Sequence, residues 1–236
     1  MSKVKFFSSG LLDIFFPPFC DVCGTRLVPD EKVVCGSCWK RLTPTDLGDW
    51  KSRLTHKDGL DTLWTGWFLD RVLRGIVYGL KYHERRVLAT GLSGRLAKMF
   101  GEEVRAASVD VVVPVPLHPA KVRQRGFNQS DLLGKVLSST LLLAYESRLL
   151  RRTSNTVSQT ALSTESRFAN VSGAFRVKDL RGYTRFLLVD DVVTSGATLS
   201  SCARALREAG GEYVAALTAG TPHLEGGKPS PAETSV

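Results

Sequence analysis

The chain has 236 residues, which is enough for one α/β domain of ordinary size plus a small appendage. Hydrophobic residues make up 43% and charged residues 23%, a normal globular composition rather than that of a disordered chain. The formal net charge of +9 predicts a surface that attracts anions, and phosphorylated metabolites, nucleic acid and acidic lipid all satisfy that charge.

The first segment, residues 6–16, is apolar but does not predict a membrane span. Ser, Gly and Asp interrupt it, Pro17 and Pro18 end it, and a transmembrane helix needs about 20 apolar residues. No small-residue cleavage site follows it, so we expect no export signal. We expect a short helix that packs on the domain or on a partner, no transmembrane segment, and a cytoplasmic protein.

Two C-x-x-C pairs follow directly, formed by Cys20 with Cys23 and by Cys35 with Cys38. Four thiolates brought together by two tight turns close a tetrahedral site, so the pattern predicts a structural Zn²⁺. Two thioredoxin-like redox pairs are the alternative, but neither pair opens an evident helix after a strand. The clustering also favours a reducing compartment over a secreted disulfide framework. The fifth cysteine, Cys202, falls within a predicted helix and is expected to be a small buried hydrophobe.

Strand and helix patterns alternate through the rest of the chain. We expect strands at 63–68, 109–115, 186–189 and 213–217, and helices at 73–80, 87–104, 128–143 and 197–209. Such alternation predicts an α/β fold with a parallel sheet, whose ligands gather at the carboxyl ends of the strands. We therefore divide the chain into an apolar helix and zinc module (1–45), a connector (46–60), the α/β domain (61–221) and a disordered tail (222–236).

Basic residues recur at element ends. Lys81 closes a helix, Arg123 and Arg125 lie beyond the strand at 109–115, and Arg152 precedes a polar stretch (153–164) that we expect to be a mobile lid. Cations placed there suit a pyrophosphate or a nucleic-acid backbone. The plainer alternatives are a solvated basic turn at Arg123 and Arg125, and a lysine that only compensates its helix dipole.

The strand at 186–189 ends in two adjacent carboxylates, Asp190 and Asp191, and a loop of small residues leads from there into a helix. The loop reads Thr194, Ser195, Gly196, Ala197 and Thr198. Its backbone amides and hydroxyls, with the start of the helix behind them, predict a phosphate site, and the acids could hold a ribose diol or a metal-bound water. A Walker B element would need an upstream G-x-x-x-x-G-K-[ST], which the chain lacks. A capped turn with solvated acids is the remaining alternative.

This string resembles the signature of type I phosphoribosyltransferases that binds 5-phosphoribosyl-1-pyrophosphate (PRPP). Other segments occur in the same order in the ComF family, namely 79–82, 114–117, 125–129, 167–170 and 173–175. The resemblance runs from about residue 16 to 217. It implies a type I phosphoribosyltransferase-like fold, PRPP held with Mg²⁺, ribose contacts from Asp190 and Asp191, and the 5′-phosphate in the loop 194–198.

Three functions stay open at this point. The chain could be a phosphoribosyltransferase acting on PRPP, although the sequence does not identify the acceptor substrate. It could instead bind PRPP as a regulatory ligand while a basic surface handles single-stranded DNA in natural competence, as the ComF resemblance suggests. It could also be an adaptor whose zinc module and apolar helix dock a competence protein.

Overall fold

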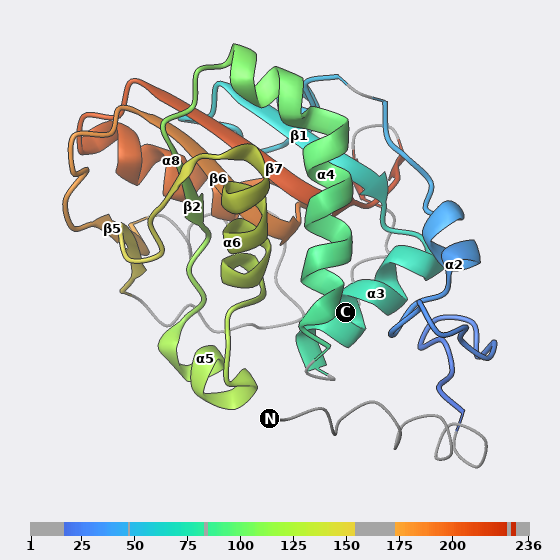
Figure 1. The fold of residues 1–236 in the computed structure, drawn as a ribbon. Helices are drawn as coiled ribbons and strands as arrows, with labels where there is room; N and C mark the ends of the chain where they lie inside the picture. The colour runs from blue at the N-terminus through green and yellow to red at the C-terminus, as the bar shows by residue number, and fades with distance from the viewer. Residues whose placement is uncertain (1–16, 47, 83–84, 154–172, 226–227, 230–236) are drawn as a thin grey trace.

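A parallel five-stranded sheet forms the centre of the protein in the computed structural model, which describes residues 17–46, 48–82, 85–153, 173–225 and 228–229 (Figure 1). The strand order is β1-β7-β6-β2-β3, and every neighbouring pair is parallel. The strands are β1 (Thr62–Phe68), β2 (Val111–Pro114), β3 (Ala144–Tyr145), β6 (Arg185–Val192) and β7 (Tyr213–Thr221).

Helices cover both faces of this sheet, as the α/β pattern predicts. The helices α4 and α6 lie over one face, and α8 lies behind the other (Figure 1). The longer helices are α3 (Arg71–Tyr82), α4 (Val87–Ala106), α6 (Gln129–Leu141) and α8 (Ala197–Glu208), with the shorter α5 (Pro119–Arg125), α2 (Gly36–Lys40) and the 3-10 turn η1 (Lys51–Arg53). Two small antiparallel ladders pair β4 (Leu150–Arg152) with β5 (Phe175–Val177) and β8 (Leu224–Glu225) with β9 (Lys228–Pro229).

Apolar runs such as that of β2 are buried because alternate residues of one strand serve two cores. Val112 packs with the α3, α4 and α6 side, whereas Val111 and Val113 pack with the α8 side. Buried side chains of the cysteine module belong to the first core, and Trp50 of the connector belongs to the second. The module and the connector therefore cover opposite faces of one sheet.

The sheet changes direction between β2 and β6. From β2 the chain continues outward to β3, whereas β6 is followed by β7 on its other side. In an open parallel sheet a crevice forms outside the carboxyl ends of the strands at such a point, and ligands bind there. The helix α5 with its basic residues follows β2, and Asp190, Asp191 and the loop 194–198 lie at the end of β6, so both predicted site elements lie at the same edge of the sheet.

The predicted strands and long helices are confirmed, with boundaries that shift by a few residues. The sequence did not predict α5, η1 or the short strands β3, β4 and β5, and the described part of the tail contains the β8–β9 ladder. Most of the expected lid and the N-terminal apolar segment lie outside the described residues. Over the part of the chain that the structure describes, no helix combines the length and the apolar character needed to cross a bilayer.

Candidate anion-binding site and metal centre

The two carboxylates at the end of β6 are held by the first turn of α6. Asp191 is only 4% exposed, and its Oδ1 lies 3.4 Å from Nε2 of Gln129. The Oδ1 atom of Asp190 accepts a hydrogen bond of 2.7 Å from the hydroxyl of Ser130. Because Asn128 caps this helix through the amide of Ser130, the chain places both polar side chains next to the acids. Gln129 lies in one of the segments that resemble the ComF family, but neither Gln129 nor Ser130 was predicted as a site residue.

Lys81, the penultimate residue of α3, forms an ion pair with the second acid. Its Nζ atom lies 2.7 Å from Oδ2 of Asp191, and the two side chains are 16% and 6% exposed. Burial favours the neutral carboxyl, but the charge of Lys81 and its hydrogen bond outweigh that effect and lower the pKa of Asp191. The pair is thus a buried salt bridge, in which loss of either partner leaves an uncompensated charge.

The pKa of Asp190 is shifted in the opposite direction from that of Asp191. Burial, followed by repulsion from Asp191, raises the pKa of Asp190 to about 7. The hydrogen bonds from Ser130 and from the amide of Asp191 offset only part of this effect. Asp190 therefore titrates near neutral pH, and a ligand that donates hydrogen bonds or brings positive charge would favour its ionised form.

Four cations from three elements form a cluster that adjoins this acid pair. Burial lowers the pKa of Lys121 in α5, and the charges of Arg125, Arg152 and Lys81 lower it further, so these three cations all lie within electrostatic reach of Lys121. Arg152, at the end of β4, also interacts with the charge of Asp190. The structure thus brings together the predicted Lys81, Arg125 and Arg152.

Two residues of the basic run on α5 depart from the sequence interpretation. Arg123 is exposed and is absent from the charges that act on Lys121, so it does not join this cluster. Lys121 was not predicted as a site residue but is half-buried within the cluster. The spacing 121, 125 on a helix places both side chains on one face, and that spacing was the available signal.

The backbone of the loop 194–198 is held by part of the segment 46–60, which the sequence analysis interpreted as a connector. Gly196 has φ +84° and caps α8, and a Cβ atom there would lie 2.2 Å from the carbonyl oxygen of His56. The amide of His56 donates a 2.9 Å hydrogen bond to the carbonyl oxygen of Ser195, and Leu54 packs against the same glycine. Residues 54–56 thus lie directly against the loop and fix its backbone.

The four cysteines of the N-terminal module point at one centre. Sγ of Cys20 lies 3.8 Å from Sγ of Cys38, Sγ of Cys23 lies 3.7 Å from Sγ of Cys35, and all four sulfurs fall within 4.8 Å of one another. Zinc–sulfur bonds of about 2.3 Å in a tetrahedron give sulfur–sulfur edges of about 3.8 Å. The residues therefore fit one tetrahedral Zn²⁺, and the gathering of both pairs around one point argues against two separate redox dithiols.

The backbone of the module supports the same assignment. Sγ of Cys20 accepts a hydrogen bond from the amide of Cys35, and Sγ of Cys35 accepts one from the amide of Cys38, each at 3.4 Å. Such amide donors stabilise thiolates, the form that binds the metal. Cys202 is fully buried on α8, away from this group, as the sequence predicted.

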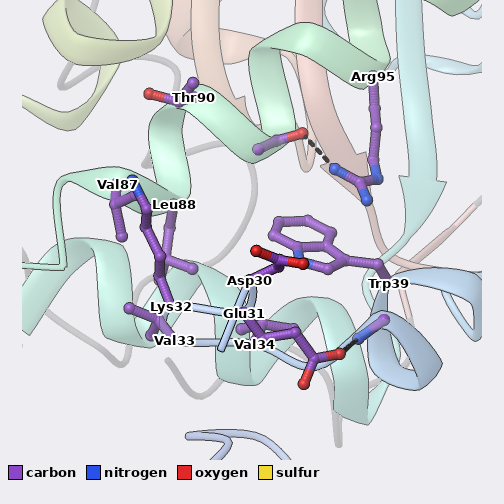
Figure 2. A pocket seen from close by; sticks show the side chains of 12 residues that line it. Asp30, Glu31, Lys32, Val33, Val34, Trp39, Val87, Leu88, Thr90 and Arg95 are labelled. Carbon is purple, nitrogen blue, oxygen red and sulfur yellow. Dashed lines mark hydrogen bonds between the residues drawn. The ribbon is translucent and has the colours of Figure 1, made fainter. Parts of the chain in front are cut away.

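Trp39, one residue after the last cysteine, fixes the module to α4. A Cβ atom on Gly91 would lie 2.7 Å from the indole ring, so only glycine allows this approach. The guanidinium of Arg95, one turn further along α4, stacks at 4.1 Å from the ring centroid. Figure 2 shows this contact at one side of a pocket of about 370 Å³ that the module forms with α4.

A second contact joins the module to α3. A Cβ atom on Gly75 would lie 3.3 Å from the side chain of Val22, and Gly79 faces Asp21. Asp21 also forms a 3.1 Å ion pair with Arg85, just beyond the helix. The first C-x-x-C turn, which contains Asp21 and Val22, therefore packs on the helix that carries Lys81 to the acid pair.

Fold and side chains together define an α/β protein with a cysteine module arranged for metal binding and with carboxylates and cations gathered at the switch point of its sheet. A family model described as a double zinc ribbon domain matches residues 11–48. That segment contains four cysteines and no histidine, which is the ligand set of one zinc site.

Curated relatives extend over most of the chain. DNA utilization protein YhgH of Escherichia coli is 30% identical over 198 residues, covering 83% of this chain and 80% of the relative. Competence protein F of Haemophilus influenzae is 28% identical over 204 residues, covering 84% and 82%. Competence protein ComFC of Streptococcus pneumoniae is 32% identical over 118 residues, covering 50% and 51%. The chain belongs to the ComF family, which these relatives represent.

Proposed function

We propose that the protein binds PRPP in the crevice at the carboxyl ends of β2 and β6. One observation carries the proposal: two adjacent carboxylates adjoin a cluster of four cations that come from separate parts of the chain, and two of these cations interact directly with the acids. A ligand for such a site needs both a dense negative charge and neutral groups that donate hydrogen bonds. PRPP has a pyrophosphate, a ribose diol and a 5′-phosphate, and so meets both requirements.

The carboxylates would accept hydrogen bonds from the two ribose hydroxyls. Asp191 is held in its ionised form by Lys81, and Asp190 acquires its charge near neutral pH. Mg²⁺ accompanying the pyrophosphate would add positive charge close to both acids and favour their ionised forms. Ser130 and Gln129 would keep the carboxylates oriented toward the crevice.

The cations would hold the pyrophosphate. Arg125 and Arg152 both lie within electrostatic reach of Lys121, and burial lowers the pKa of Lys121 and of Arg152. A polyanion placed between them would replace mutual repulsion with attraction. The loop 194–198 at the start of α8 would receive the 5′-phosphate, where the helix dipole and the loop amides attract an anion.

Calorimetric titration with PRPP and Mg²⁺ tests this assignment. Saturable binding is expected for the unaltered chain, and it should disappear in the variant with Asp190→Asn and Asp191→Asn. Glu102→Gln removes an exposed carboxylate near the other end of α4 and should leave binding intact. Ribose 5-phosphate and pyrophosphate, each titrated alone, separate the loop from the cation cluster. Unchanged PRPP affinity in the double variant would refute the site.

The names of the relatives favour a second role in DNA handling. Two relatives are named competence proteins and another a DNA utilization protein, and a net charge of +9 suits a polyanionic partner. We therefore propose that this chain also contacts single-stranded DNA, with competence proteins as partners, and that it acts in the cytoplasm, where its free thiols stay reduced. Binding of a labelled oligonucleotide at 150 mM salt, on the order of physiological ionic strength, tests the DNA contact.

An enzymatic role, in which PRPP transfers its ribosyl group to an acceptor, has a separate readout. Release of pyrophosphate from PRPP on addition of candidate nucleobases would support transfer. PRPP binding without such release would leave PRPP as a ligand that regulates the protein.

A further inference from the structure

Two tyrosines on α3 face solvent beside the anion site. Tyr78 is 48% and Tyr82 46% exposed, and their ring centroids lie 4.9 Å apart with a 43° angle between the ring planes. The opposite side of the helix supplies the core through residues such as Leu73, Ile76 and Leu80, each fully buried. The two rings, which we call the tyrosine platform, are therefore not required to fill the core.

Cations adjoin this platform. The guanidinium of Arg125 lies 4.8 Å from the ring centroid of Tyr82, and Nη2 of Arg125 donates a 3.0 Å hydrogen bond to the phenol oxygen. A second pair of the same kind lies nearby in the sequence, with Arg86 over Phe127 at 5.2 Å. Arg125 therefore lies against the exposed ring of Tyr82, and the second pair, whose ring is buried, lies just beyond the ends of α3 and α5.

Several cations on this side have no acidic partner among the described residues. In the parts of the chain that the structure describes, no carboxylate forms an ion pair with Arg86, Lys121, Arg123 or Arg125. Lys81, next to Tyr82, is already paired with Asp191. Flat hydrophobic faces and uncompensated cations on one surface are suited to a partner that combines exposed rings with regularly spaced negative charges.

We propose that the tyrosine platform is the binding surface for single-stranded nucleic acid. Bases would stack on Tyr78 and Tyr82, and phosphates would contact Arg125 and the neighbouring cations of α5. Every base has a face that can stack, so this binding would be independent of sequence. Duplex DNA keeps its base faces covered and could offer only its phosphates. The proposal rests on the DNA handling proposed above and assigns a surface to it.

Fluorescence anisotropy of a labelled single-stranded dT20 at 150 mM salt tests the platform. Stacking contributes about 1–3 kcal/mol per base when measured by alanine substitution. The variant with Tyr78→Ala and Tyr82→Ala should therefore bind at least about tenfold more weakly. The variant with Tyr78→Phe and Tyr82→Phe keeps both rings and should stay within about threefold of the unaltered chain. Tyr78→Ala alone serves if the double variant folds poorly.

Salt dependence separates stacking from charge. The alanine variant loses no cation, so its slope of log affinity against log salt should equal that of the unaltered chain. Arg125→Ala should reduce the slope by about 0.7, the value for one phosphate contact on a single strand. Lys98→Ala removes an exposed cation on the outer side of α4 and should change neither affinity nor slope. Binding to a duplex of equal length should not respond to the tyrosine changes.

The outcomes distinguish the platform from the broader role. If the unaltered chain does not bind dT20, the proposed DNA handling fails and the platform fails with it. If the unaltered chain binds and the alanine variant binds equally well, DNA handling stands but this surface is wrong. Equal weakening of single-stranded and duplex binding in the alanine variant would also overturn the stacking assignment.

Discussion

Replacing Asp190 with Asn is expected to stabilise the free protein above neutral pH while it abolishes ligand binding. Burial and the charge of Asp191 raise the pKa of Asp190 from 3.8 to about 7. Between these values the folded protein holds a proton that the unfolded chain has released, so the free energy of unfolding falls as pH rises. At about 1.4 kcal/mol per pKa unit, the whole interval corresponds to about 4 kcal/mol. Asparagine keeps an oxygen to accept the hydrogen bonds from Ser130 and the Asp191 amide, but carries no charge.

Urea unfolding of both proteins at pH 5 and pH 8 measures this effect. The stability of Asp190→Asn relative to the unaltered chain should rise by about 2–3 kcal/mol between these pH values, since most of the titration lies in that window. Asp58→Asn removes an exposed carboxylate and should show no such rise. Parallel pH dependence of the unaltered chain and Asp190→Asn, or a variant that is less stable at pH 8, would refute the electrostatic reasoning.

Three further predictions concern the supports of the site. Lys81→Met should lower the free energy of unfolding by about 3–5 kcal/mol because it strands the buried Asp191 carboxylate, and adding Asp191→Asn should restore most of it in urea unfolding. Gly196→Ala should reduce both PRPP affinity and the free energy of unfolding, because its Cβ would meet the carbonyl oxygen of His56. Gly94→Ala, on an open surface of α4, is the control and should be neutral or slightly stabilising in the same assays. Chelation of zinc should lower both the melting temperature of the whole chain and its PRPP affinity, because the cysteine module packs into the core that holds α3; a main domain that melts and binds unchanged would contradict this.

Patterns in the sequence located the acids and the metal ligands because local chemistry determines both. The β-branched run at 111–113 and the apolar residues before Asp190 are typical of buried strands, and parallel strands carry their following residues to one edge. The C-x-x-C spacing likewise determines a tight turn without help from the rest of the fold. These features were therefore predictable from short windows of the chain.

Other features depend on contacts between distant segments. Nothing in the polar stretch around His56 indicates that its backbone lies against Gly196, because that contact joins residues 140 positions apart. Helical spacing places Tyr78 and Tyr82 opposite the buried Ile76, but it does not tell whether that side faces solvent or the cysteine module. Likewise, the proximity of Lys121 to Arg152 could not be predicted without knowing where β4 lies in the fold.

The glycines of α3 make this helix, and the lysine it carries, depend on the N-terminal cysteine module. Glycine weakens a helix by about 0.5–1 kcal/mol relative to alanine, so Gly75 and Gly79 lower the intrinsic stability of a helix whose last turn holds Lys81. The helix tolerates them because Val22 and Asp21 cover that side. A recombinant fragment that begins at residue 46 would retain every proposed contact to PRPP, yet its key helix would be both uncovered and intrinsically weak. We therefore expect that expression and crystallisation of a protein able to bind PRPP will require the cysteine segment and its metal in the same polypeptide.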